Sequence, residues 1–403
     1  MMKNRKGTTA VFLVFILTAM MSLVWAFIYA AREVSMRSYG DGLLQLAGNS
    51  VLSEYSRQLK DEYGLFAFYG DNREMENKIK SYVNYSLAFQ KSASLTEVKV
   101  GLSSGSLGSG EILEQQILEY MKFVIAKKLL KARKPQDNQV QRAEHRVLRN
   151  QVVIRSLPSF GLRGESGLVD WVTHLGKGIP ELRVALKKNT EKWLINQYIL
   201  YQFKHAANQT VDRNTFFSNE VEYILEGDYQ DEANRKGVKA GIVALRTPLN
   251  LGHIYTDRVK RNELITLAEL ITPGPQALLT QAAFAAIWAL AEAENDAALL
   301  TGGKKVPLVK DKSTWATDLS SVINNTSSDY IEPKVNKGLT YEGYLTIFLH
   351  FQNKGIKLAR VADLIQINMK GNYDGNFQIW DYYCAFRSAS LINGRLYEYE
   401  TKY

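Results

Sequence analysis

Residues 101–105 read GLSSG, which fits the G-x-S-x-G pattern of serine hydrolases, where the nucleophile stands on a tight strand-to-helix turn. A strand-like run precedes this pentapeptide and a helix-like run follows it, so Ser103 is a candidate nucleophile. The glycine- and serine-rich composition continues to Gly110, however, and no later pair of Asp and His stands out as its partner. We therefore interpret residues 101–110 as a flexible linker, and keep a membrane-tethered envelope hydrolase as an alternative function.

Other residues that could perform catalysis or bind metals are few and scattered. The five histidines show neither the H-E-x-x-H pattern nor a close His–carboxylate spacing for zinc. Cys384 is the only cysteine, and its apolar aromatic neighbours would raise the pKa of its thiol. Residues 372–381 imitate part of a calcium loop, but Lys370 stands where the first carboxylate should be. We expect no catalytic residue, no metal ion, no cofactor and no enzyme activity.

Cations concentrate between residues 122 and 155, within a chain of net charge +9. The candidate polyanion-binding residues are Lys127, Lys128, Lys131, Arg133, Lys134, Arg142, Arg146 and Arg149. The last three share one face of a predicted helix. Each Lys or Arg near an anionic surface contributes about 1 kcal/mol, so binding of anionic cell-wall polymers is a second alternative function. A solvated pair of amphipathic helices would show the same pattern.

An apolar amino-terminal segment predicts the cellular location of the rest of the chain. No charged side chain lies between Lys6 and Arg32, and a helix over residues 8–31 would be roughly 36 Å long, enough to cross a hydrocarbon core of ~30 Å. The apolar run of a cleaved secretory signal is shorter, about 7–15 residues. We therefore expect a retained single-pass transmembrane helix over residues 7–31, with cleavage behind it as the alternative.

The cations that flank this segment predict its orientation. Lys3, Arg5 and Lys6 precede it, whereas only Arg32 and Arg37 follow it closely. The short tail is then cytoplasmic, and the carboxyl-terminal domain is extracytoplasmic at the cell membrane. The lipid bilayer is therefore an expected partner, and nucleic acid is not. An exported chain with one cysteine cannot form an internal disulfide, which suits a Gram-positive cell surface.

The segment RKGTTAVF at residues 5–12 resembles the start of TadE/TadG-like proteins of tight-adherence pilus systems. Residues 50–68, 220–227, 286–296, 299–310 and 338–344 are similar to an uncharacterised group of Gram-positive TadE-like single-pass membrane proteins. The resemblance implies an accessory, minor-pilin-like role in a tight-adherence pilus or secretion apparatus, with other subunits as partners. It also implies a processing site after Gly7, although Phe12 stands where processed members usually carry Glu, so we expect the tail to be kept.

Hydrophobic periodicity predicts an α+β fold that is predominantly α-helical. A helix continues past the membrane with a break at Gly40–Gly42, and the Asn393-Gly394 dipeptide predicts a β-hairpin near the carboxyl terminus. Residues 276–290 are apolar but too short to cross a membrane, which predicts a buried core helix. The expected parts are a tail (1–6), a transmembrane helix (7–31), a membrane-proximal helix with a small α/β segment (32–100), a linker (101–110) and a helix-rich domain with the hairpin (111–403).

Overall fold

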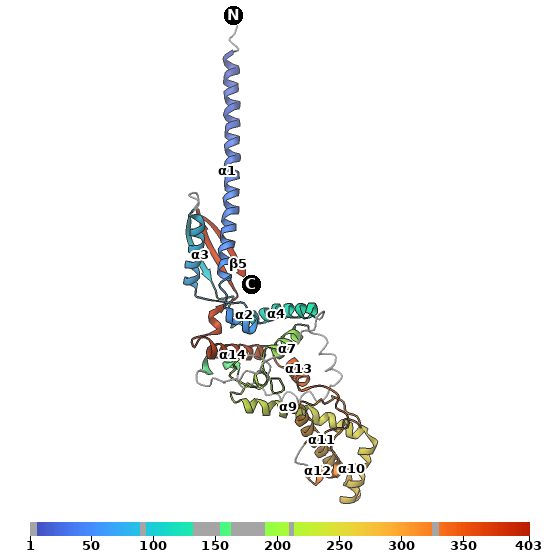
Figure 1. Ribbon diagram of the computed structural model, residues 1–403. Helices are drawn as coiled ribbons and strands as arrows, with labels where there is room; N and C mark the ends of the chain where they lie inside the picture. The colour runs from blue at the N-terminus through green and yellow to red at the C-terminus, as the bar shows by residue number, and fades with distance from the viewer. Residues whose placement is uncertain (1–5, 89–93, 132–153, 163–189, 209–212, 325–329) are drawn as a thin grey trace. The chain divides into compact units, whose positions relative to one another are not determined.

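The computed structural model describes residues 6–88, 94–131, 154–162, 190–208, 213–324 and 330–403 (Figure 1). Over these residues the chain is mostly helical with small antiparallel sheets, so the predicted α+β class is confirmed. The chain divides into two compact units. The anchor unit comprises Met1–Arg57, Phe66–Leu107 and Trp380–Tyr403, and the helical unit comprises Gln58–Leu65 and Gly108–Ile379.

The first helix of the anchor unit, α1 (Lys6–Leu52), is one continuous helix of 47 residues (Figure 1). The predicted break at Gly40–Gly42 is therefore wrong. A Cβ atom on Gly40 would lie 2.9 Å from the ring of Tyr397, and one on Gly48 would lie 2.8 Å from the hydroxyl of Thr401. These two glycines give a β-strand room to pack against the helix, and packing offsets their low helix propensity.

A second helix and a three-stranded sheet complete the anchor unit. Helix α3 (Asn72–Leu87) begins at Asp71, whose side chain accepts a hydrogen bond from the amide of Glu74. The antiparallel sheet consists of β2 (Leu95–Gly101), β4 (Ala385–Ile392) and β5 (Arg395–Lys402), in that order. A two-stranded sheet pairs β1 (Phe68–Tyr69) with β3 (Tyr382–Tyr383). The backbone φ angles of Asn393 and Gly394 are 51° and 77°, so the predicted hairpin turn is confirmed.

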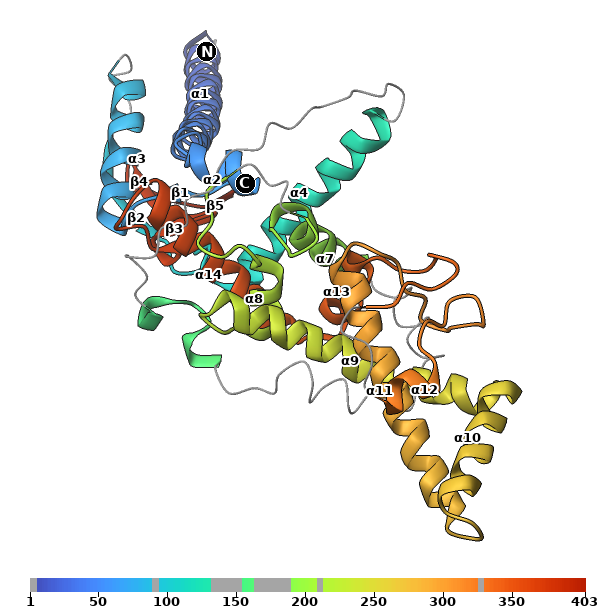
Figure 2. The same ribbon diagram turned by 60° about the horizontal axis from the view of Figure 1, so that its bottom comes forward.

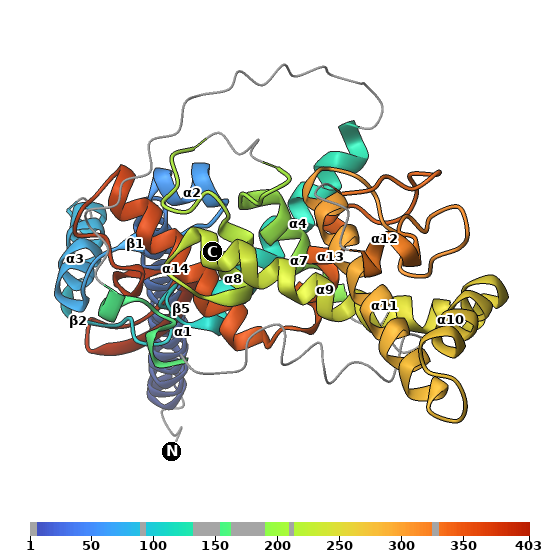
Figure 3. The same ribbon diagram turned by 90° about the horizontal axis from the view of Figure 1, so that it is seen from below.

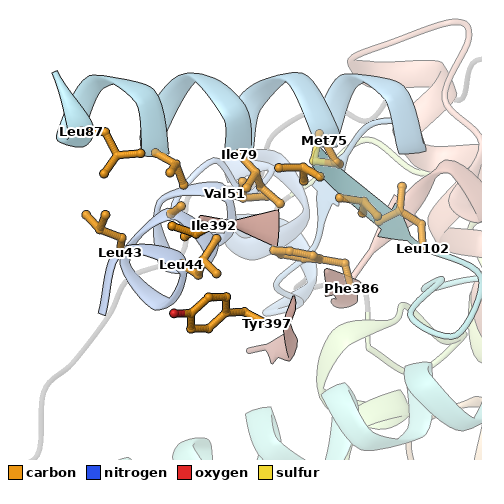
Figure 4. Packing of buried hydrophobic residues seen from close by; sticks show 14 of the residues in the cluster. Leu43, Leu44, Val51, Met75, Ile79, Leu87, Leu102, Phe386, Ile392 and Tyr397 are labelled. Atoms are coloured by element: carbon orange, nitrogen blue, oxygen red, sulfur yellow. The ribbon is translucent and has the colours of Figure 1, made fainter. Parts of the chain in front are cut away.

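The core of the anchor unit joins segments from both ends of the chain (Figure 4). Helix α1 contributes Leu43, Leu44, Ala47 and Val51, α3 contributes Met75, Ile79 and Val83, and the sheet contributes Val98, Phe386 and Ile392. The carboxyl-terminal hairpin therefore belongs to the anchor unit. The prediction that residues 111–403 form one domain with the hairpin is wrong in this respect, because strand pairing with β2 holds the hairpin there.

Residues 101–110 are not the flexible linker that their composition predicts. The amide of Leu107 donates to the carbonyl of Tyr382 at 2.7 Å, and the carbonyl of Gly105 accepts from the amide of Cys384 at 2.7 Å. A Cβ atom on Gly105 would lie 2.0 Å from the carbonyl oxygen of Ala385. Small residues are needed here because the segment packs directly on strand backbone. The boundary between the units nevertheless falls between Leu107 and Gly108, inside the predicted segment.

The helical unit contains the remaining helices. They are α2 (Arg57–Tyr63), α4 (Gly110–Lys131), α7 (Thr190–Gln202), α8 (Glu220–Glu226), α9 (Asp231–Thr256), α10 (Arg258–Ile271), α11 (Ala277–Thr301), α12 (Leu319–Ile323), α13 (Tyr341–Phe351) and α14 (Lys354–Asn372). The first residue of α2, Arg57, still belongs to the anchor unit. Short 3-10 turns lie at Ile154–Ser156, Phe160–Leu162 and Ile379–Asp381, the last of which ends in the anchor unit. Helices α9 and α11 lie side by side, and α10 folds back along α11 (Figures 2 and 3).

Two helices of this unit differ from what their sequences alone suggest. Pro248 lies inside α9 and does not end it, although proline disfavours a helix interior, and the chain turns at Asp257, whose side chain caps α10 by accepting from the amides of Val259 and Lys260. Helix α11 is a core helix on one face only. Trp288 on its inner face is buried, whereas Leu279 on the opposite face is 77% exposed.

Candidate functional site

Ser103 lies in a turn that follows β2, with the amide of Gly105 donating to the carbonyl of Leu102 at 3.0 Å. A nucleophile elbow would open directly into a helix, but α4 begins only at Gly110. Within the described residues, no hydrogen bond joins the Ser103 hydroxyl to a histidine or a carboxylate. Among the described residues, the candidate nucleophile Ser103 therefore has no catalytic partner.

Cys384, His205 and His350 are buried, and His253 is partly buried. Burial raises the pKa of the Cys384 thiol to about 12 and lowers the pKa of His205 to about 4. His253 stacks on Trp315 with ring centroids 5.3 Å apart, and His350 is buried. Over the described ranges, no group of three or more His, Cys, Asp or Glu side chains could hold a metal ion. His145 and His174 lie outside those ranges.

The predicted polyanion-binding residues fall mostly outside the described part of the chain. Lys127 is exposed on α4, and Lys128 and Lys131 belong to the same helix by their backbone. Arg133, Lys134, Arg142, Arg146 and Arg149 lie outside the described residues. The common helix face of Arg142, Arg146 and Arg149 therefore remains a prediction. Gly7, the residue that the resemblance marks for processing, lies in the first turn of α1.

The amino-terminal part of α1 presents a large exposed apolar surface. Large apolar side chains from Val11 to Val34 are exposed on all sides of the helix, with Trp25 and Tyr29 both 70% exposed. Two polar side chains of this part are satisfied within the helix: the hydroxyls of Thr18 and Ser22 donate to carbonyls three or four residues earlier at 2.8–3.0 Å. A helix of this length and composition can cross a membrane.

The electrostatics of α1 change abruptly after the apolar part. Glu33 lies 3.0 Å from the guanidinium of Arg395 at the start of β5, and the hydroxyl of Tyr399 donates to Asp41. From Glu33 onward, α1 packs against the sheet. Helix α1 therefore has two parts: an exposed apolar part and a part that packs against the sheet.

A buried ionic cluster in the helical unit was not predicted from the sequence. Arg246 on α9 and Asp296 on α11 form an ion pair of 2.9 Å with both side chains fully buried. Lys310 contacts both Asp296, at 2.5 Å, and Glu292. Asn250 adds a hydrogen bond to Asp296 at 3.2 Å. The cluster therefore holds two cations and two anions, and its charge is balanced.

This cluster fastens the segment after α11 to the helices. Glu292 accepts hydrogen bonds from the amides of Ala316 and Thr317 at 3.0 and 2.8 Å, and Arg246 donates to the carbonyl of Leu308 at 2.7 Å. The signal in the sequence was the spacing: two acids four residues apart in an apolar helix, and Arg246 four residues before Asn250. Because every charge has a partner within the cluster, its role is structural.

Comparison with known proteins identifies one family. Residues 109–394, more than half of the chain, match the model of a family of unknown function, DUF5702. The match begins next to the boundary at Gly108 and ends at the turn of the carboxyl-terminal hairpin. No curated protein and no solved structure matches the chain significantly. The chain therefore belongs to the DUF5702 family.

Proposed function

We propose that this chain is a membrane-anchored structural subunit, and that α1 both anchors it and associates laterally with other subunits in the bilayer. The observation that carries the proposal is the division of α1 at Glu33. Before this residue the apolar side chains are exposed and uncharged, and after it Leu43, Leu44 and Val51 are buried against the sheet. A free-standing apolar helix of this length is unfavourable in water and favourable in lipid.

A long helix that is half embedded in the membrane and half packed in a head is the arrangement that pilin-like subunits use. Together with the resemblance at residues 5–12, it supports a TadE/TadG-like, minor-pilin-like accessory role in a tight-adherence pilus or secretion apparatus. The head would then be extracytoplasmic, because Lys3, Arg5 and Lys6 favour a cytoplasmic tail. The partners would be the lipid bilayer and other subunits of the apparatus.

Crosslinking within native membranes, followed by purification of the full-length chain and mass spectrometry, tests this function. We expect pilus or secretion subunits among the crosslinked neighbours, and an amino terminus that still precedes Gly7. Recovery of no such component from a strain that expresses the apparatus would contradict the assembly role. An amino terminus that begins at Thr8 would show processing and would contradict the retained tail.

A further inference from the structure

The turn between α10 and α11 carries exposed aliphatic side chains from both helices. Leu270 and Ile271 at the end of α10 are 78% and 54% exposed, and Leu278 and Leu279 in the first turn of α11 are 71% and 77% exposed. We call residues 270–279 the hairpin tip. An exposed apolar cluster on a folded unit marks a contact with a protein or with a membrane.

The hairpin is held together without these four side chains. Leu264 on α10 is buried in one cluster with Ala285 and Trp288 of α11. Nearer the turn, the hydroxyls of Thr272 and Thr280 share a hydrogen bond of 2.9 Å. The apolar side chains of the tip are therefore not part of the core that joins α10 to α11, and their exposure to water is unfavourable.

The hairpin tip is also uncharged. The chain has no charged residue between Glu269 and Glu292, and Glu292 is buried. Glu269 is exposed and precedes Gly274 in the turn by five residues, about 7.5 Å along a helix. Apolar helix faces that lie in the membrane interface are buried about 5–10 Å deep. Insertion to this depth would cover the tip with lipid and leave Glu269 among the headgroups.

The backbone of the turn suits a lipid environment. Pro273 and Pro275 have no amide hydrogen. Four other amides donate to carbonyls within residues 268–280 at 2.9–3.4 Å, and they belong to Thr272, Ala277, Leu279 and Thr280. An unpaired backbone group is costly in hydrocarbon, because no water is present to bond to it. These features lower the cost of moving the turn from water into lipid.

A protein partner fits the hairpin tip less well. Contacts between proteins combine an apolar centre with a polar rim that forms hydrogen bonds. Within residues 270–279, Gln276 is the one residue with an exposed polar side chain. Figures 2 and 3 show the turn at the outer end of the hairpin formed by α10 and α11. A projecting end of this kind can enter a bilayer more readily than it can cover a protein surface.

We propose that the hairpin tip inserts into the interfacial region of a lipid bilayer and forms a second membrane contact, separate from α1. This contact goes beyond the anchoring function proposed above, because it uses a different unit of the chain. The contact is apolar rather than electrostatic, since the tip has no cation to attract anionic headgroups. At interfacial depth the amide of Gln276 can still bond to water or to lipid ester carbonyls.

Fluorescence quenching tests this contact with the full-length chain reconstituted into phosphatidylcholine vesicles. A fluorophore on Leu279→Cys should be quenched several-fold more by phospholipids that carry a quencher on an acyl chain than the same fluorophore on Glu294→Cys. Glu294 is the matched control, because it is exposed on the same helix. Cys384 is buried and should stay unlabelled. The quenching should persist at about 1 M salt, where the Debye length is ~3 Å.

Charged substitutions make the test specific to the hairpin tip. Leu270→Asp combined with Leu278→Asp should reduce the quenching at position 279 to the level of the Glu294→Cys control, because both changes place a charge in the inserted part. Leu290→Asp should leave the quenching unchanged. Leu290 is also exposed on α11, but it lies eleven residues from Leu279, about 16.5 Å along the helix. Equal effects of the tip variant and of Leu290→Asp would overturn the proposal.

A fluorophore on Val24→Cys in α1 separates this proposal from the anchoring function. If the label in α1 is quenched and the label at the tip is not, anchoring stands and tip insertion is refuted. If the tip label is quenched and the label in α1 is not, tip insertion stands and anchoring fails. A tip label whose emission shifts to the blue without quenching by the lipids would be buried against protein, which also refutes the insertion.

Discussion

Substitution of Glu292 by Gln should destabilise the helical unit more than almost any other single isosteric change. Gln keeps the shape of the side chain but removes one of the two negative charges of the buried cluster. In the wild type, the amide and the hydroxyl of Thr317 both donate to the Glu292 carboxylate. Gln would place an NH₂ group, itself a donor, against one or more of the groups that donate to this side chain. The cluster would then bury one uncompensated positive charge.

The expected loss follows from that imbalance. Breaking a buried ion pair by removing one partner is destabilising by about 3–5 kcal/mol. Glu294→Gln is the matched control, because Glu294 lies two residues away on the same helix and is exposed. Its effect should stay within about 0.5 kcal/mol. A double variant with Lys310→Met should lose less than the sum of the two single variants, because both partners are then neutral.

Hydrogen exchange read by mass spectrometry on peptides from α9 and α11 measures this loss locally. At about 1.4 kcal/mol per factor of ten, exchange in Glu292→Gln should be roughly 10²- to 4 × 10³-fold faster than in the wild type. The reasoning is refuted if Glu292→Gln and Glu294→Gln exchange at similar rates. It is also refuted if the double variant loses as much as the two single variants together.

Three other predictions concern packing, pH and thiol chemistry. Gly48→Val should destabilise the anchor unit by about 1–3 kcal/mol in chemical denaturation, because its Cβ would lie 2.8 Å from the side chain of Thr401. The control Gly42→Ala should be neutral or stabilising, because a Cβ there would meet no atom within 4 Å. Equal losses of stability in the two variants would contradict this packing. Burial lowers the pKa of Lys357 from 10.5 to about 7, so the unfolded chain binds more protons between these values and stability should rise with pH across that window. Lys357→Met should remove this rise in urea unfolding at pH 7 to 10, and an unchanged slope would argue against a buried neutral amine. Cys384 should resist maleimide at neutral pH until the chain is denatured, and rapid labelling of the folded chain would show that the thiol is not buried.

The elements that the sequence predicts well are those set by local signals. Residues 73–89 and 341–351 show helical periodicity and correspond to α3 and α13. The Asn-Gly dipeptide specifies a turn with two positive φ angles by itself, so the hairpin could be found without knowledge of its surroundings. The apolar helix is likewise a property of one uninterrupted segment.

What the sequence could not predict depends on contacts between distant segments. Pairing of β2 with β4 joins residues almost 300 positions apart, as the hydrogen bond between Ser94 and Asn393 illustrates. The sequence likewise does not show which distant residue contacts Gly40. Gly40 therefore predicted a break in the helix, although the close approach of Tyr397 requires a glycine at this position. The spacing of Glu292 and Asp296 was visible, but their cation Lys310 lies beyond the end of the helix.

The most direct test of the account is protease treatment of intact protoplasts that produce the full-length chain. We expect the carboxyl-terminal domain to be digested from outside, leaving in the membrane fraction a short fragment that contains residues 7–31. A full-length chain that survives in intact protoplasts and is digested only after lysis would contradict the proposed topology. A chain recovered in the soluble fraction would contradict the anchor itself.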